Sequence, residues 1–312
     1  AGVERNLGHD YLLDIDARYE ESARITSPTP WDIINELMQG GLGAGELGVI
    51  VSPAGIGKTW VLSAMGAYAI SKKLNVVHYT LELNEAYVGL RYDSIFSGFE
   101  GQNLKYHKEE VMEMLFKLEG KLTIKYYPTK SCTVNTLSAH LKKAMTFGEK
   151  IDMVIVDYAD IMRDIHKTRE MRHALGNIYE DLRGMAGEFQ IPIWTASQAN
   201  RSALDEDVIE ASRIAESYAK IMVADFVMSL SRKIEDKISN TGRFHVIKNR
   251  FGPDGLTYPA RINTNIGKIE LFEATSTQGK DIQYKIKNRD NQAKQILSQR
   301  YDDLMKGEEI DN

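Results

Sequence analysis

Residues 52–59 combine the residue types and the spacing that a phosphate-binding loop requires. The segment Ser52-Pro-Ala-Gly-Ile-Gly-Lys-Thr59 follows an apolar run of strand length and opens a helical pattern. The backbone N–H groups of such a loop, with the N-terminus of its helix, bind nucleotide phosphates. Lys58 would reach the β- and γ-phosphates, and the Thr59 hydroxyl would help to hold Mg²⁺. The pattern departs from the usual one at Ser52, where glycine is expected. ATP with Mg²⁺ is the predicted cofactor, bound by Ser52, Ala54, Gly55, Ile56, Gly57, Lys58, Thr59 and Trp60.

A carboxylate ends a second apolar strand. The segment Met153-Val-Ile-Val-Asp157 is typical of a buried strand. The carboxyl ends of parallel strands meet at one edge of a sheet, so Asp157 is expected beside the phosphate-binding loop, where it can bind Mg²⁺ through water. Many buried strands end in aspartate, and the pairing with the loop makes this pattern specific. Asp160 is the alternative metal ligand.

Two further polar side chains end predicted strands. Glu82 closes Tyr79-Thr-Leu-Glu82, the strand that follows the helix of the phosphate-binding loop and is therefore expected near the loop's own strand. There its carboxylate can orient or deprotonate an attacking water, although Glu85 is a competitor for this role. Gln198 closes Ile193-Trp-Thr-Ala-Ser-Gln198, and its amide can sense the γ-phosphate and couple it to the loop that begins at Asn200.

Two cations, Lys248 and Arg250, alternate near the end of a late strand, in Val246-Ile-Lys-Asn-Arg250. Such cations can stabilise the charge of a phosphoryl-transfer transition state, as an arginine finger does. On composition alone, a solvated strand end explains them equally well.

Strand and helix patterns alternate around these motifs, and the apolar strands are unbroken. Together they predict an α/β fold, a mostly parallel sheet with helices on both faces. After residue 203 the strands are separated by Gly-containing turns, which predicts β-hairpins at one edge of that sheet. The predicted strands are 47–51, 75–83, 122–127, 153–156, 191–196, 224–231, 243–248, 257–263 and 268–271, and the predicted helices are 31–38, 58–72, 85–96, 107–118, 134–147 and 168–189.

The two ends of the chain differ from this core. Gly8–Arg24 is charged, with apolar residues at roughly helical spacing, and stops at Ser27-Pro-Thr-Pro30. A charged helix this short needs a surface to pack on. The segment after Thr275 is polar and holds one predicted helix, Asn291–Lys306. The expected organisation is a linker helix over 1–30, an α/β nucleotide-binding domain over 31–274 and a polar tail over 275–312.

Composition excludes several classes of protein. The chain has 312 residues with a formal net charge of −5, and 43% of its residues are hydrophobic, which excludes a fully disordered chain. No apolar run approaches the ~20 residues that span a bilayer, so no membrane partner is expected. Cys132 is the only cysteine, which excludes a disulfide framework and a multi-cysteine zinc site. No leader pattern is present, and a cytoplasmic protein is expected.

The serial order of these motifs resembles the RecA-fold motor domain of DnaB-type hexameric replicative helicases, phage-encoded members in particular. The resemblance runs from about Asp10 to Leu271 and rests on SPAGIGKT, YTLEL, VIVDYADIM, TASQANR and IKNRFGPDG. The last segment is the most specific, because Lys-x-Arg followed by Gly-Pro-x-Gly is not a general feature of phosphate-binding loops.

The resemblance implies a RecA-like ATPase with an N-terminal linker helix, which forms a hexameric ring, translocates on single-stranded DNA and unwinds duplex. In that family the linker helix, here Gly8–Arg24, docks on the adjacent subunit, and the nucleotide lies between subunits. Lys248 and Arg250 would reach the neighbour's γ-phosphate. The residues acting within one subunit would be Lys58, Thr59, Glu82, Asp157 and Gln198.

The resemblance also implies partners. Loops after the second and third motif strands hold the single-stranded DNA backbone in this family, and the matching cations are Arg163, Lys167, Arg169, Arg201 and Arg213. Each of them can equally be an ordinary surface charge. Family members usually carry an N-terminal helical domain that recruits primase. Only the linker-like stretch is represented here, which leaves a primase or a loader open as a partner.

Two alternatives share the same core. A RecA-like recombinase or a RadA/KaiC-like ATPase would form filaments or signalling rings without unwinding duplex, and the late Lys-x-Arg segment argues against it. A non-catalytic nucleotide-binding module has no need of a base such as Glu82 beside Lys58 and Asp157.

Overall fold

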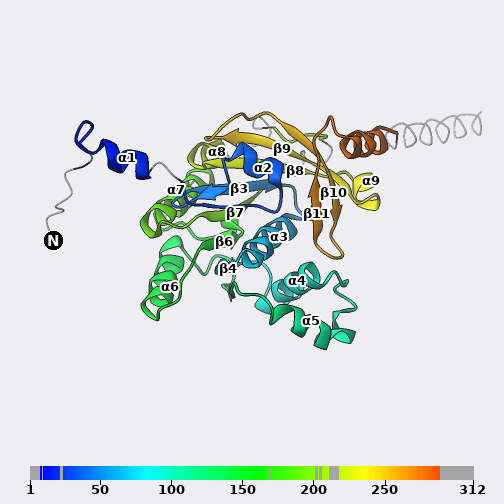
Figure 1. Cartoon of the computed structure of the whole chain (residues 1–312), viewed down its shortest axis with the longest axis horizontal. Coiled ribbons are helices and arrows are strands. Elements are labelled where there is room, and N and C mark those ends of the chain that lie inside the picture. Colours follow the sequence, from blue (N-terminus) through cyan, green and yellow to red (C-terminus); the bar gives the residue numbers. More distant parts are fainter. Residues whose placement is uncertain are drawn as a thin grey trace, which may run out of the picture.

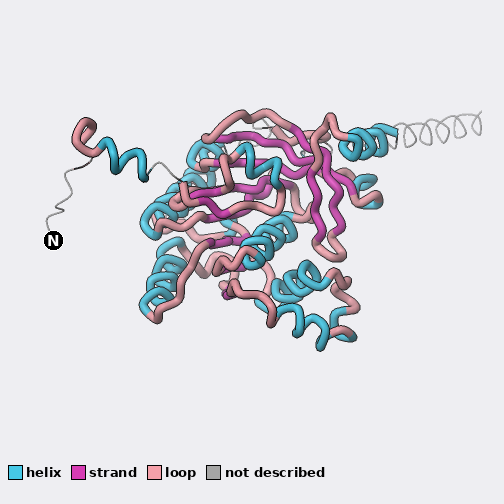
Figure 2. The backbone as a smooth tube through the Cα atoms, viewed as in Figure 1, coloured by secondary structure: helices cyan, strands magenta, loops and turns pink. Residues whose placement is uncertain are grey.

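The computed structural model describes residues 8, 10–21, 24–166, 168, 170–200, 203, 206–210 and 218–288. Within them, a nine-stranded sheet lies between two layers of helices (Figure 1, Figure 2). Its strands are β3 (Leu47–Ser52), β4 (Val76–Thr80), β5 (Leu122–Tyr126), β6 (Met153–Asp157), β7 (Ile193–Gln198), β8 (Phe226–Ser231), β9 (Thr241–Asn249), β10 (Thr257–Asn263) and β11 (Lys268–Leu271). Strands β1 (Thr26–Ser27) and β2 (Leu42–Gly43) form a separate two-stranded sheet.

Among the described residues the helices are α1 (Ile15–Glu21), α2 (Asp32–Leu37), α3 (Lys58–Ser71), α4 (Glu85–Ser97), α5 (Lys108–Leu115), α6 (Val134–Thr146), α7 (Met171–Phe189), α8 (Tyr218–Val223) and α9 (Ile234–Ile238), with single 3₁₀ turns η1 (Leu104–Tyr106) and η2 (Ala159–Ile161). Helices α2 to α7 follow the predicted periodicities, with ends that differ by about three residues at most. Helix α1 is shorter than predicted, and α8 and α9 were not predicted.

The central strand β3 is apolar throughout because both of its faces are covered. Ile50 packs in one core with α3, while Val49 and Val51 pack in a second core with α7. The strand order is β11-β10-β9-β8-β3-β7-β6-β4-β5, and all pairs from β8 to β5 are parallel. The predicted fold class is therefore confirmed.

The register of the parallel strands brings the motif residues to one edge of the sheet. Ser52 at the end of β3 pairs with Gln198 at the end of β7, and Asp157 at the end of β6 pairs with Thr80 at the end of β4. Glu82 lies two residues beyond Thr80. Strand β4 is separated from β3 by β7 and β6, and Glu82 nevertheless lines the pocket beside the phosphate-binding loop.

The predicted hairpins are confirmed at the other side of β3. Strands β8, β9, β10 and β11 are joined by antiparallel pairing, with a bulge between Val227 and Met228. Two short helices, α8 and α9, flank β8, and the sequence did not predict them.

The N-terminal segment differs from the predicted continuous helix over Gly8–Arg24. Residues 11–14 form a turn, and only Ile15–Glu21 is helical. Figure 1 shows α1 projecting away from the sheet. Arg24 then joins the main body, because its guanidinium pairs with Glu46 at 2.6 Å and lies over the ring of Phe251.

The C-terminal segment also departs from expectation. Residues 277–288 are helical, and Ile282 within them is buried. The sequence analysis did not predict a helix here. The burial of Ile282 is a feature of the tertiary structure, which a local sequence pattern does not show. The helix that the sequence predicts at Asn291–Lys306 lies outside the described residues and stays a prediction.

Candidate nucleotide-binding site

The loop between β3 and α3 has the backbone geometry of a phosphate cradle. Gly55 and Gly57 have φ angles of +70° and +124°, in the region that favours glycine. Helix α3 begins at Lys58 without a side-chain cap, so its first N–H groups face the loop. Ser52, at the position where glycine is usual, is fully buried and donates its hydroxyl to the carbonyl of Pro53.

Lys58 is folded back onto this loop. Its Nζ lies 3.3 Å from the carbonyl oxygen of Ser52 and 3.1 Å from that of Pro53. Burial lowers the pKa of Lys58, while the nearby carboxylates of Asp157 and Glu82 oppose that shift. An incoming phosphate would replace neutral carbonyls with a charged partner, which is the stronger kind of hydrogen bond.

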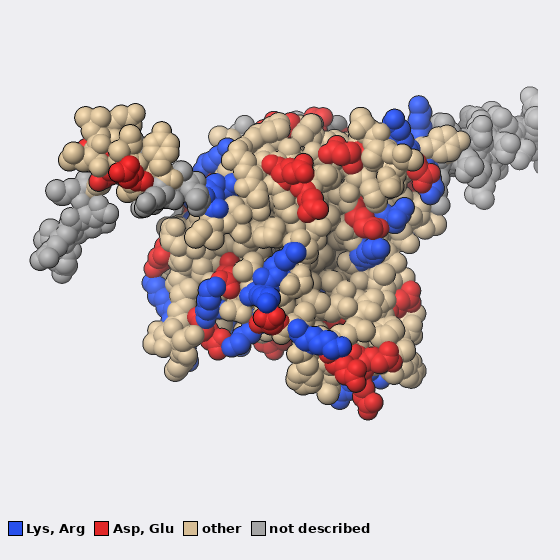
Figure 3. Space-filling view, in the orientation of Figure 1, with Lys and Arg blue, Asp and Glu red and all other residues tan. Residues whose placement is uncertain are grey.

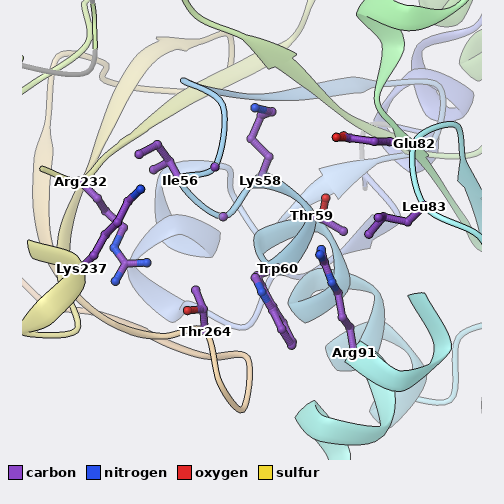
Figure 4. A pocket seen from close by; sticks show the side chains of 12 residues that line it. Ile56, Lys58, Thr59, Trp60, Glu82, Leu83, Arg91, Arg232, Lys237 and Thr264 are labelled. Carbon is purple, nitrogen blue, oxygen red and sulfur yellow. The ribbon is translucent and has the colours of Figure 1, made fainter. Parts of the chain in front are cut away.

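A pocket of about 320 Å³ opens beside the loop. Figure 4 shows the Glu82 side chain pointing toward Lys58, with Arg232 and Lys237 at the opposite end. Four cations and one carboxylate make the lining strongly basic, as an anionic ligand requires. The pocket is lined by Gly55, Ile56, Gly57, Lys58, Thr59, Trp60, Glu82, Leu83, Arg91, Arg232, Lys237 and Thr264.

The sequence analysis named no site role for five of these residues, which are Leu83, Arg91, Arg232, Lys237 and Thr264. Arg91 lies two turns into α4 with its guanidinium over the Trp60 ring, 5.0 Å from the centroid. Arg232 and Lys237 come from the end of β8 and from α9, and Thr264 from the turn after β10. None follows a recognisable motif, because tertiary packing alone brings these elements to the loop. Helical periodicity gives Arg91 the same pattern as an arginine on the solvent-exposed face of a helix, so it does not indicate a pocket residue.

Asp157 is a buried carboxylate beside the loop. Burial raises the pKa of Asp157 to about 6. The hydrogen bond from Thr59 and the positive charges of Arg91 and Lys58 oppose this shift. Its Oδ1 has no hydrogen-bond partner among the described residues. The Nε2 of His78, similarly without a partner there, lies 4.0 Å from Asp157 Oδ2.

This geometry fits a divalent cation with a nucleotide. A buried, unpaired carboxylate oxygen beside a threonine hydroxyl is a set of hard oxygen donors, which Mg²⁺ prefers. Thr59 and Asp157 are the residues that would hold the ion, and the ion would neutralise charge on the phosphates.

We expect Asp157→Asn to stabilise the ligand-free protein at pH 7. The unfolded pKa is 3.8 and the folded one about 6, so the folded state binds more protons between them. The free energy of unfolding therefore falls as the pH rises from about 4 to about 6, and the cost is complete above that range. At ~1.4 kcal/mol per pKa unit, asparagine should recover at most about 3 kcal/mol.

Denaturant unfolding without nucleotide or metal at pH 7 and pH 4 measures this effect. The difference between the variant and the wild type should vanish at the lower pH. With Mg²⁺ and nucleotide added, the wild type should gain stability that the variant lacks. An asparagine variant less stable than the wild type at pH 7 would contradict the expected cost of the buried charge.

Gln198 lies at the edge of this site without lining the pocket. Its side chain is exposed, and its Oε1 accepts a hydrogen bond from the Tyr158 hydroxyl at 3.3 Å. Both oxygens of Asp160, the alternative metal ligand, accept hydrogen bonds from protein groups, in contrast to Oδ1 of Asp157, which has no such partner among the described residues.

Lys248 and Arg250 lie at the opposite edge of the sheet. Arg250 follows β9, whose end pairs with the start of β8, and its guanidinium contacts Asp225 at 2.6 Å. Asp225 also accepts a hydrogen bond from the backbone of Leu47, the first residue of β3. Lys248 donates to the carbonyl of Met222 at 2.5 Å. Neither cation lines the pocket.

Only one of the predicted DNA-contacting cations lies within the described residues. Arg163 is exposed, in the segment between η2 and α7. Lys167, Arg169, Arg201 and Arg213 lie outside the described part of the chain. Basic and acidic side chains are interspersed over the face shown in Figure 3, without a single large basic field.

Comparisons with known proteins place this geometry in a family. The family described as DnaB-like helicase C terminal domain matches residues 28–266. A DnaB-like replicative helicase of Enterobacteria phage T4 is 25% identical over 269 residues, which cover 79% of this chain and 55% of that protein. The replicative DNA helicase DnaB of Helicobacter pylori (strain ATCC 700392 / 26695) is 24% identical over 172 residues, covering 54% of this chain and 35% of that protein. The chain thus spans about half or less of the length of these relatives.

Two solved structures share the fold. The ATPase domain of G40P superposes with a TM-score of 0.72 at 19% identity, covering 85% of this chain and all of that domain. A DnaB-like replicative helicase, whose structure was described with its interactions with primase, superposes with a TM-score of 0.72 at 17% identity. It covers 85% of this chain and 69% of that one. The RecA-like topology is therefore shared.

Proposed function

The chain belongs to the family of DnaB-like helicase C-terminal domains, and we propose that it is an ATP-driven motor that translocates on single-stranded DNA and unwinds duplex. ATP with Mg²⁺ would be the cofactor. Lys58 would bind the phosphates, Glu82 would orient and deprotonate the attacking water, and Gln198 would sense the γ-phosphate. Family membership favours this function over a recombinase that does not unwind DNA.

The placement of Arg250 carries this proposal. The nucleotide pocket lies beyond Ser52 at the carboxyl edge of β3, whereas Asp225 holds Arg250 beside Leu47 at the other end of that strand. Five residue steps separate Leu47 from Ser52, which is roughly 16 Å along a strand. Arg250 therefore cannot reach the nucleotide of its own chain, and we propose that it completes the site of a neighbouring copy.

A ring of copies, hexameric as in the family that the motifs resemble, would supply such a neighbour on each side. Helix α1 supports this assembly, because Leu12 and Leu13 before it are 78% and 82% exposed. An apolar pocket of about 510 Å³ between α4 and α5 is lined in part by Leu90, Val111 and Leu115. We propose that the α1 segment of one copy packs into this pocket of the next.

Single-stranded DNA would contact the cations that follow β6 and β7. Arg163 is the described candidate, and Lys167, Arg169, Arg201 and Arg213 complete the proposed set. Cationic side chains that track a nucleic-acid backbone give a salt-dependent affinity. A primase or a loader is proposed as a further partner, since a structural neighbour was described with its interactions with primase. Among the described residues, no helix combines the length and the hydrophobicity that crossing a bilayer requires.

Steady-state ATP hydrolysis with and without single-stranded DNA tests the proposal, with the oligomeric state followed by light scattering. We expect a ring whose turnover rises when DNA is added, and unwinding of a forked duplex in the presence of ATP. Turnover that ignores DNA, or a chain that stays monomeric with nucleotide and DNA, would contradict the motor function.

Replacing Leu12 and Leu13 together with serine should dissociate the ring. Burying a leucine side chain contributes ~1.5–3 kcal/mol, so the subunit dissociation constant should rise by about 100-fold or more. Light scattering over a dilution series measures the shift. The matched control is Phe147→Ser, which removes an exposed apolar side chain at the end of α6 and should leave the ring intact. Equal effects of both substitutions would refute the proposed packing of α1.

A further inference from the structure

Asp160 and Lys220 form a buried ion pair that the proposed catalytic roles do not use. The Nζ of Lys220 lies 2.8 Å from Asp160 Oδ1, and the two side chains are 3% and 12% exposed. Lys220 also donates to the hydroxyl of Ser197 at 3.2 Å. Removing two charges from water carries a large desolvation cost, so a pair this buried calls for a specific role or for full hydrogen-bonding compensation.

The compensation is extensive and joins several elements. Asp160 Oδ1 accepts from the Tyr179 hydroxyl on α7 at 2.8 Å, and Asp160 Oδ2 accepts from the backbone N–H of Gln198 at 2.9 Å. Burial raises the pKa of Tyr179 well above its ordinary value, so its hydroxyl stays a donor. One carboxylate thus links η2, β7, α7 and α8.

Residues of the short turn after β6 contact Gln198, the proposed γ-phosphate sensor, at both its backbone and its side chain. The backbone N–H of Gln198 is bound by Asp160, and the side-chain Oε1 accepts from the hydroxyl of Tyr158, two residues before Asp160. The Tyr158 ring in turn lies 5.5 Å from Lys58 Nζ. Both the backbone and the amide of Gln198 are therefore held by the same short turn after β6.

The network also joins the two ends of the segment proposed to contact DNA. The chain leaves β7 at Gln198 and returns in α8, which contains Lys220. Asp160 contacts both Gln198 and Lys220, so a single carboxylate connects the two ends of this segment.

From these contacts we infer that Asp160 and Lys220 are positioning residues that couple Gln198 to the start of α8, so that the nucleotide state sets the affinity for single-stranded DNA. The inference rests on the proposed function, because it assigns the residues that couple the nucleotide site to the site for single-stranded DNA. Asp160 and Lys220 touch neither the nucleotide pocket nor, in this inference, the DNA.

The test separates coupling from stability. Single-stranded DNA affinity is measured by anisotropy of a labelled oligothymidylate, with Mg²⁺ and either a non-hydrolysable ATP analogue or ADP. The ratio of the two affinities reports the coupling, and ratios of ~5- to 150-fold are typical of coupled sites. Lys220→Met and Asp160→Asn should each bring the ratio toward one.

The double variant Asp160→Asn with Lys220→Met is the decisive one. Each single variant leaves a buried charge without its partner, whereas the double removes both charges, so the double should regain thermal stability over the singles. If the pair couples the sites, the affinity ratio stays near one despite that recovery. Tyr179→Phe, which removes one hydrogen bond to Asp160, should lower the ratio partially in a well-folded protein.

A matched control lies elsewhere in the fold. Asp236 accepts from Arg243 at 3.0 Å, from the hydroxyl of Thr241 and from the backbone of Lys233, with similar burial. Asp236→Asn with Arg243→Met should leave the affinity ratio unchanged. A wild-type ratio retained in the Asp160–Lys220 double variant and in Tyr179→Phe would overturn the inference alone. A wild type with equal DNA affinity in both nucleotides would overturn the proposed function and the coupling with it.

Discussion

Replacing Glu82 with glutamine is expected to lower the kcat of ATP hydrolysis by about 10²–10⁴-fold, the range for loss of a general base. Glu82 projects beyond the end of its strand into the nucleotide pocket and points toward Lys58 (Figure 4). It is exposed to the pocket, so a water can lie between the carboxylate and a phosphate. Glutamine has nearly the same shape but cannot accept the proton, and nucleotide affinity should therefore change little.

Glu85 is the matched control for this prediction. It lies three residues later, and its carboxylate accepts a hydrogen bond from the backbone of Tyr126 while lying 3.9 Å from Lys125 Nζ. Glu85→Gln should retain turnover. Steady-state hydrolysis and binding of a fluorescent nucleotide, measured on both variants, separate kcat from affinity. Loss of turnover in Glu85→Gln with normal turnover in Glu82→Gln would reverse the assignment.

Arg250→Ala should reduce hydrolysis by about 10³–10⁵-fold, the range for removal of an arginine finger. The ring and nucleotide binding should persist, because Arg250 is remote from the pocket of its own chain. The buried carboxylate of Asp225, which is 1% exposed, orients the Arg250 guanidinium through their ion pair. The Arg250 side chain itself is 50% exposed and so remains accessible to a neighbouring copy. Arg183→Ala removes the other arginine on Asp225 and should leave a finger in place.

Mixed rings test whether Arg250 acts on a neighbour. Lys58→Ala and Arg250→Ala subunits should each be inactive alone. In a mixture, an Arg250→Ala chain retains its own Lys58 and can receive Arg250 from a Lys58→Ala neighbour, so part of the activity should return. Mixtures that stay inactive while light scattering shows mixed rings would place Arg250 outside the catalytic site.

Local patterns were sufficient for the sheet strands, for helices α2 to α7 and for the phosphate-binding loop. Gly55 and Gly57 have the left-handed backbone that such a loop needs, and Asp157 and Gln198 each end a parallel strand as expected. Strand-end positions are predictable because a parallel sheet aligns its carboxyl ends. The order of strands is not a local property, so the sequence did not show that β7 and β6 lie between β3 and β4.

Tertiary contacts account for the other differences. Asp160 has the residue type of a metal ligand, but Lys220, sixty positions later, occupies its oxygen. Arg91 enters the pocket because α4 packs against α3, and no spacing in the sequence signals that approach. Strand β9 runs antiparallel to β8, so Arg250, which follows β9, lies beside the start of β8. The sequence shows this position only once the strand that pairs with β9 is known.

The separation of Arg250 from its own pocket has an arithmetical consequence. With Arg250 acting on a neighbouring copy as proposed, each chain would carry the greater part of one catalytic site and the last component of another. An open row of n chains would then have n − 1 complete sites, whereas closing the row into a ring would complete all n. A solitary chain would hold ATP without consuming it, and turnover per chain would rise with protein concentration until rings predominate. ATP hydrolysis would then be highest in the closed ring, in which every site is complete.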